Sequence, residues 1–196
     1  MHFNHNKAIE FWRWFQSIEK QLSENLTNPH LIKKLDSLVS SIGKFEWELG
    51  PLDDAIRYLA ISPILSKELL TATREIIKLA PICIGWQFLP AKPAKKGQLV
   101  FEMTNQYGTQ ITVDASKWEY VLYQYEDYTF GIDITIGDID CSLDIAYLAA
   151  DIALTNILGE EEYMEAISDV KIVKTFEQTG KASMFEHLGE HLLSLK

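Results

Sequence analysis

Cysteine is scarce in this chain, and its scarcity excludes several classes of protein. Only Cys83 and Cys141 occur among 196 residues. Neither lies in a Cys-x-x-Cys or Cys/His zinc spacing, so the sequence implies no disulfide framework and no structural metal, and both thiols are expected to be reduced and buried. The first residues lack the apolar core of a signal peptide, and no run approaches the roughly 18 apolar residues of a membrane span. The expected compartment is the cytoplasm, with no membrane partner.

Basic residues are also few, because 18 lysines and arginines stand against 28 aspartates and glutamates, for a formal charge of -10. A polyanion would be repelled at long range, so DNA and RNA are not expected as partners. Lys92, Lys95 and Lys96 cluster beside two prolines, which predicts a solvated loop rather than a basic patch. The acidic balance suits a basic protein partner.

Catalytic motifs are missing as well. The chain contains no serine elbow, glycine-rich phosphate loop, kinase set or dinucleotide fingerprint. This absence favours a protein that is not an enzyme and that carries no cofactor. Hydrophobic residues make up 47% and charged residues 23% of the chain, which is ordinary composition for a globular protein with one sizeable core.

Apolar spacing predicts a helical hairpin over residues 1-43. Three- and four-residue steps place the apolar residues of the first helix along one side; they are Ile9, Trp12, Phe15, Ile18, Leu22 and Leu26. Asn28 is expected to cap a second helix with Pro29 in its first position, and Gly43 is expected to end it. In the first helix, five consecutive aromatic and arginine positions, Phe11–Phe15, cannot all face one core, so Phe11 and Trp14 are either exposed or packed against a second element.

The remaining chain predicts hairpin, helix and strand in that order, twice. Alternating apolar and polar residues indicate the hairpins. The first ββαβ half covers residues 44-92, with its helix capped by Ser66 and a strand at Trp86–Leu89. The second covers residues 118-175, with a helix at Ser142–Leu158, an acidic turn at Glu160–Glu162 and a strand near Val170–Val173.

These elements predict an α+β fold with a largely antiparallel sheet built from two ββαβ halves after an N-terminal helical hairpin. Residues 93-117 are expected to form a connecting loop with short strands, and residues 176-196 a C-terminal helix from about Ser183 to Leu195. The two halves suggest an internal duplication within a single domain, 1-196. They would either join in one continuous sheet or form two small subdomains side by side.

One short string has metal-site spacing. His187-Leu188-Gly189-Glu190-His191 matches the inverted zinc-peptidase pattern H-x-x-E-H, in which both histidines reach one metal and the glutamate serves a bound water. A catalytic zinc also needs a third, rigidly held protein ligand, and Gly189 weakens the terminal helix. A solvated helix is therefore the preferred interpretation, and no metal site is predicted.

Two acidic groups admit structural explanations. The segment from Gly137 to Asp144 carries three carboxylates but lacks the ligand spacing and central glycine of an EF-hand, so Asp140 or Ser142 is expected to cap the following helix. Asp144 and Asp151 are seven residues apart on one helix face. They form either a solvent-exposed stripe, which is favoured, or a buried polar pair.

The predicted binding residues lie on the late hairpin. If Trp118, Tyr120 and Leu122 point inward, then Glu119, Tyr123 and Tyr125 point outward, beside Asp133 on the partner strand. Tyrosine is enriched at protein interfaces because it contributes a large area at low entropy cost. The alternative is that the first two helices cover this sheet face.

Three segments carry a resemblance to a known group of proteins. They are the aromatic run Phe11–Phe15, the string Gly85-Trp86-Gln87-Phe88 before the lysine loop, and Asp144-Ile145-Ala146-Tyr147 in a helix that ends in Leu158-Gly159-Glu160. Together they resemble bacterial α+β proteins of unassigned function. The resemblance implies no catalytic residues.

The leading functional hypothesis is a non-enzymatic protein-binding or regulatory module, similar to an inhibitor or immunity protein, whose binding residues are Glu119, Tyr123, Tyr125 and Asp133. Two alternatives stay open. One is a metal-dependent hydrolase that uses His187, Glu190 and His191, and the other is a structural subunit of a homo-oligomer.

Overall fold

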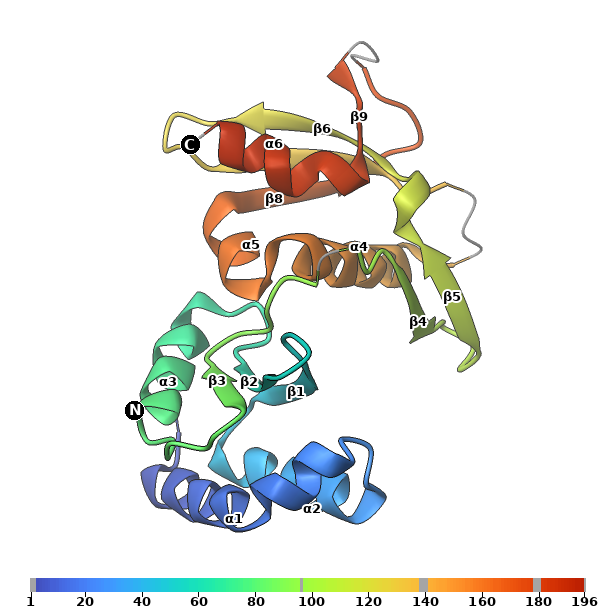
Figure 1. Ribbon diagram of the computed structural model, residues 1–196. Helices are drawn as coiled ribbons and strands as arrows, with labels where there is room; N and C mark the ends of the chain where they lie inside the picture. The colour runs from blue at the N-terminus through green and yellow to red at the C-terminus, as the bar shows by residue number, and fades with distance from the viewer. Residues whose placement is uncertain (1–2, 96, 138–140, 178–180, 196) are drawn as a thin grey trace. The chain divides into compact units, whose positions relative to one another are not determined.

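The structure is a computed structural model that describes residues 3–95, 97–137, 141–177 and 181–195 (Figure 1). The chain is α+β as predicted, with six α-helices and three mostly antiparallel sheets in these ranges. It divides into two compact units, Met1–Lys92 and Pro93–Lys196. The assignment of the whole chain to a single domain stays a prediction.

The first unit begins with the predicted helical hairpin, α1 (His5–Glu24) and α2 (Pro29–Ile42). Asn28 caps α2 by accepting hydrogen bonds from the backbone N–H groups of residues 30 and 31, Pro29 occupies the first turn, and Gly43 ends the helix. Helix α1 is shorter than expected, because Asn25 adopts an extended backbone and ends it before Leu26.

A three-stranded sheet follows, in the order β1-β2-β3. Its strands are β1 (Glu46–Pro51), β2 (Arg57–Ser62) and β3 (Trp86–Leu89), and α3 (Lys67–Lys78) connects β2 to β3. Strands β1 and β2 are antiparallel, whereas β3 lies parallel to β2. The side chain of Ser66 caps α3 as predicted.

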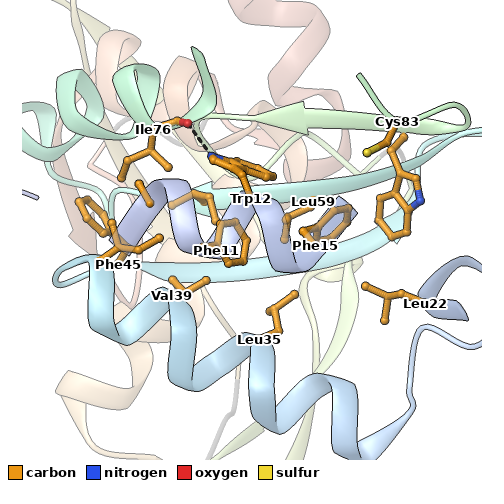
Figure 2. Packing of buried hydrophobic residues seen from close by; sticks show 14 of the residues in the cluster. Phe11, Trp12, Phe15, Leu22, Leu35, Val39, Phe45, Leu59, Ile76 and Cys83 are labelled. Carbon is orange, nitrogen blue, oxygen red and sulfur yellow. Dashed lines mark hydrogen bonds between the residues drawn. The ribbon is translucent and has the colours of Figure 1, made fainter. Parts of the chain in front are cut away.

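The core of this unit lies where α1 and α2 meet the sheet and α3 (Figure 2). The Trp12 indole N–H donates to the backbone carbonyl of Ile76 at 2.8 Å, and the ring of Phe15 packs edge-on against Trp86 with 5.0 Å between centroids. Phe11 is fully buried, and Trp14 packs, partly buried, at the edge of the cluster. Phe11 is therefore a core residue, and Trp14 packs against the core cluster while staying partly exposed.

The second unit contains two sheets. A separate hairpin, β4 (Val100–Thr104) with β5 (Gln110–Asp114), forms one. The other has the order β8-β7-β6-β9, and its strands are β6 (Glu119–Gln124), β7 (Phe130–Thr135), β8 (Ile167–Ile172) and β9 (Ser183–Met184). Strands β6 and β7 are antiparallel and β7 and β8 are parallel.

Helices connect and follow these strands. Between β7 and β8 the chain forms α4 (Leu143–Leu158) and α5 (Glu160–Ala166). The acidic turn predicted at Glu160–Glu162 is wrong: Gly159, at φ 79°, breaks the helix, and the three glutamates begin a new one. Acidic side chains in a first helical turn are stabilised by the helix dipole, which explains why they do not form a loop.

The predicted C-terminal helix is also too long. Ser183 and Met184 pair with β6 instead of starting a helix, a single 3-10 turn covers Phe185–His187, and α6 covers only Leu188–Ser194. Phe185 is fully buried beside Trp118, with 5.5 Å between ring centroids. The 3-10 turn before α6 thus contributes a buried aromatic residue to the core.

Both larger sheets contain an antiparallel hairpin and a third, parallel strand reached through helices. The described strands nevertheless fall into separate sheets rather than one continuous sheet. The second half also has an additional helix and strand, α5 and β9, so the internal duplication stays a prediction. Among the helices described, none is long and apolar enough to cross a membrane.

Candidate functional site

The four-stranded sheet of the second unit, β8-β7-β6-β9, has one apolar side and one polar side. Tyr120 is buried on the apolar side, where its hydroxyl lies 2.8 Å from His191 Nδ1 of α6. Because side chains alternate along a strand, Glu119 and Tyr123 point to the opposite side. We call this side the polar sheet face, defined by Glu119, Tyr123, Tyr125, Asp133, Asp169 and Lys171.

The centre of the polar sheet face is a contact between Tyr123 and Asp133. Tyr123 lies directly opposite Gly131 in the ladder, and its hydroxyl donates to Asp133 Oδ2 at 3.0 Å. This hydrogen bond raises the pKa of the Tyr123 hydroxyl, with smaller contributions from burial and from the negative charges of Asp133 and Glu177. The neutral phenol is therefore held as a donor to the carboxylate.

Tyr125 lies over Gly131 on the same face. A Cβ atom built at residue 131 would overlap the Tyr125 hydroxyl and would lie 3.0 Å from its Cζ, so the missing side chain makes room for the tyrosine ring. The backbone N–H of Tyr125 donates to the carbonyl of Thr129 at 2.9 Å. The turn and the glycine thus position a ring that remains 43% exposed.

Strand β8 adds two charged residues that sequence reasoning missed. In the parallel ladder Asp169 lies beside Gly131 and Lys171 beside Asp133, and the two charged side chains are 3.3 Å apart. The hydrogen bond and charge of Asp169 raise the pKa of Lys171, and Asp133 and Tyr125 add to the rise. The sequence shows that Asp169 and Lys171 alternate with apolar residues. It does not show the parallel register of β8 with β7 that brings them to the polar sheet face.

The structure thus brings together three of the four predicted binding residues, Tyr123, Tyr125 and Asp133. Glu119 shares their face but lies at the other end of β6, opposite Thr135 and next to Met184 of β9. Val121, which has the same orientation, is only 1% exposed. The polar sheet face is therefore interrupted by a buried valine between Glu119 and Tyr123.

Helices α1 and α2 pack against the sheet of the first unit. The apolar stripes of α1 and α2 are buried with Leu59 and Ile61 of β2 and with Trp86 of β3, all within the first unit. Tyr125 remains 43% exposed, and Tyr123 and Asp133 are partly exposed. The polar sheet face is therefore available for contact at its tyrosine end.

The H-x-x-E-H string does not form a metal-binding group in the part of the chain that the structure describes. His187 ends a 3-10 turn with its Nε2 3.6 Å from Glu186 Oε1, whereas His191 is engaged by Tyr120. No three His, Cys, Asp or Glu side chains of the described residues gather closely enough to hold a metal ion. Among the described residues, the third protein ligand that the metal-dependent hydrolase hypothesis requires is therefore not found.

The acidic segments play structural roles where they can be seen. Ser142 caps α4 by accepting from the N–H of Ile145 at 3.4 Å, while Asp138 and Asp140 lie outside the described residues. The expected solvent stripe on α4 is wrong for Asp151, because this residue is half-buried and accepts a hydrogen bond from the Tyr163 hydroxyl at 2.5 Å. Burial raises the pKa of the Asp151 carboxyl, whereas Asp144 is exposed.

The lysine loop and the cysteines complete the predicted candidates. Lys92 pairs with Glu46 at 2.8 Å, the backbone of Lys95 is bonded to α4, and Lys96 lies outside the described residues. Cys83 and Cys141 are not joined by a disulfide. Cys83 is buried as expected, but Cys141 is only half-buried. Burial and then the charge of Glu19 raise the pKa of the Cys83 thiol.

Comparison of the chain with protein-family models, with curated proteins and with solved structures found no match. The resemblance to bacterial α+β proteins therefore stays a hypothesis. Any functional conclusion rests on the geometry of the chain itself.

Proposed function

We propose that this protein is a non-enzymatic binding or regulatory module of the cytoplasm that holds a basic protein partner on the polar sheet face. The observation that carries this proposal is the gathering of Tyr123, Tyr125 and Asp133 on one partly exposed side of a sheet whose other side is core. A protein of this kind would act as an inhibitor or immunity protein does, by covering a functional surface of its partner.

The fixed geometry of the tyrosines favours binding. A side chain that is already ordered loses less conformational entropy when a partner covers it, so more of the contact energy appears as affinity. Tyr123 is held by its hydrogen bond to Asp133, and Tyr125 is held by its contact with the backbone at Gly131. Two ordered aromatic rings with polar ends are typical of the centre of a protein interface.

The charge of the face favours a basic partner. Glu119, Asp133 and Asp169 outnumber Lys171 on the face itself, and the whole chain carries a formal charge of -10. A negative surface raises the association rate of a positive partner and opposes a negative one. Steering of this kind weakens as salt is added.

The first test compares two charge reversals in the same unit. Asp133→Lys places a cation at the centre of the polar sheet face, whereas Glu102→Lys makes the same change at an exposed position of β4. Proteins captured from native lysate by the immobilised chain would be identified, and the affinity of the purified partner measured for both variants. We expect a basic partner that binds Asp133→Lys at least about tenfold more weakly than Glu102→Lys.

Retention of full affinity by Asp133→Lys, with its fold verified by circular dichroism, would exclude the polar sheet face as the binding surface. Equal weakening by both variants would instead indicate a general effect of net charge. Capture of an acidic partner would contradict the proposed charge complementarity.

A further inference from the structure

A groove of about 930 Å³ runs beside α6 in the second unit. Its walls come from the segment before β4, the end of α4, the start of α5 and the C-terminal turn and helix. Its lining includes Leu99, Val100, Ile157, Gly189, Leu192 and Leu193. None of them belongs to the polar sheet face.

The floor of the groove is apolar, and so is its mouth. Leu99 and Leu192 are 7% and 1% exposed, whereas Val100 and Leu193, on two different walls, are 54% and 73% exposed. Large aliphatic side chains on both sides of an opening are typical of surfaces that another apolar group covers.

Two hydrogen bonds to Asn156 join the segment before β4 to the end of α4. The N–H of Lys95 donates to the carbonyl of Asn156 at 2.6 Å, and the Asn156 amide donates in turn to the carbonyl of Gln98 at 3.2 Å. On the other wall a Cβ at residue 189 would lie 3.6 Å from Ile157 Cγ2, in ordinary contact. The segment before β4, the end of α4 and helix α6 are thus in contact around the groove.

Charged groups lie along the rim rather than on the floor. Glu186, Glu190 and His187 are exposed, and Glu162 and Lys95 are half-buried. Small-molecule sites usually present a few buried polar groups that orient the ligand, whereas this arrangement gives an apolar channel with acidic edges. Glu186 and Glu190 are the exposed acidic residues among the described lining residues, and these two carboxylates complement a cation.

We propose that this groove binds an amphipathic helix with an apolar stripe and lysine or arginine residues beside it. Such a helix inserts apolar anchors spaced by three and four residues into a groove, while its basic residues meet the acidic rim. The site is distinct from the polar sheet face, because α6 packs on the Tyr120 side of the sheet through His191, and Tyr123 points to the other side. A test of peptide binding to this groove is therefore independent of the test of the proposed function.

Gly189 offers a direct test with a matched control. Gly189→Leu puts a bulky side chain against Ile157 in the wall of the groove, whereas Gly189→Ala adds only a Cβ that the structure accommodates; both residues favour a helix over glycine, and circular dichroism verifies that both variants fold. The probe is a labelled synthetic peptide of about 14 leucine and lysine residues with helical apolar spacing, titrated with the full chain by fluorescence anisotropy. We expect saturable binding that Gly189→Leu weakens at least about tenfold relative to Gly189→Ala.

Two altered peptides and one further variant complete the experiment. A peptide of the same composition in scrambled order, and one with glutamate in place of lysine, should bind much more weakly. Glu186→Gln combined with Glu190→Gln should weaken binding and reduce its salt dependence. The proposal is overturned if the unaltered chain shows no saturable binding, if the two Gly189 variants bind alike, or if the scrambled peptide binds equally well. Loss of binding in Asp133→Lys alone would also overturn it, because the peptide would then occupy the polar sheet face.

Discussion

The two larger sheets each place a tyrosine opposite a glycine and beside a carboxylate, yet the two arrangements differ in exposure. In the first unit Tyr58 pairs with Gly50 and donates to Glu48. In the second, Tyr123 pairs with Gly131 and donates to Asp133. Tyr58 is 4% exposed, whereas Tyr123 is half-buried, so the same local geometry is core in one sheet and surface in the other.

The causes of the raised pKa values show the same difference. Burial is the largest cause at Tyr58, followed by its hydrogen bond to Glu48. At Tyr123 the hydrogen bond to Asp133 comes first and burial second. The Tyr58 group is therefore part of the packing of the first unit, whereas the Tyr123 group holds a partly exposed ring in an ordered position; under the proposed function, that ring contacts the partner.

The largest difference between the two tyrosine groups should appear in the stability of alanine variants at Gly50 and Gly131. A Cβ at Gly50 would lie 2.8 Å from a ring carbon of the buried Tyr58, whereas a Cβ at Gly131 would meet the tip of the partly exposed Tyr125. We expect Gly50→Ala to lower the free energy of unfolding by about 1–3 kcal/mol, as overpacking does, and Gly131→Ala by less than about 1 kcal/mol. Urea unfolding of both variants measures this, and equal losses would remove the distinction.

A smaller effect should appear at high pH. Because the folded-state pKa of Tyr58 lies above its unfolded value of about 10, the folded protein keeps a proton that the unfolded chain loses. The contribution of Tyr58 is therefore fully present below about pH 10 and decreases above it, by roughly 1 kcal/mol per pH unit. The urea midpoint of unfolding is measured at pH 9 and at pH 11 for Tyr58→Phe and for the unaltered chain. The difference between the two midpoints should be smaller in Tyr58→Phe than in the unaltered chain. An unchanged pH dependence would show that Tyr58 ionises as readily when folded as when unfolded.

The sequence predicted those parts of the fold that local chemistry determines. Asn28, Ser66 and Ser142 cap helices as expected, because a short polar side chain before an apolar stripe satisfies the free N–H groups of the first turn. Alternation in the late hairpin also placed Tyr123 and Asp133 on one face, since side-chain direction in a strand depends only on position.

The missing parts depend on contacts between distant segments. Asp169 and Lys171 join the site only through the parallel register of β8 with β7, which no local pattern encodes. Glu160–Glu162 looked like a turn because polarity does not distinguish a loop from a first helical turn. The position of Tyr125 over Gly131 depends on the absence of a side chain, and a glycine in a sequence does not show what fills its space. The groove beside α6 is lined by segments that are far apart in the sequence.

Photo-crosslinking at a single tyrosine position tests the central claim most directly. Replacing Tyr125 with p-benzoylphenylalanine places a crosslinker on the polar sheet face, and the same replacement at Tyr107, which is 77% exposed in the turn between β4 and β5, gives a matched control in the same unit. We predict that irradiation links a basic protein to position 125 and not to position 107, and that Asp133→Lys abolishes the product. A product at position 107 alone, or one at position 125 that survives Asp133→Lys, would contradict the account.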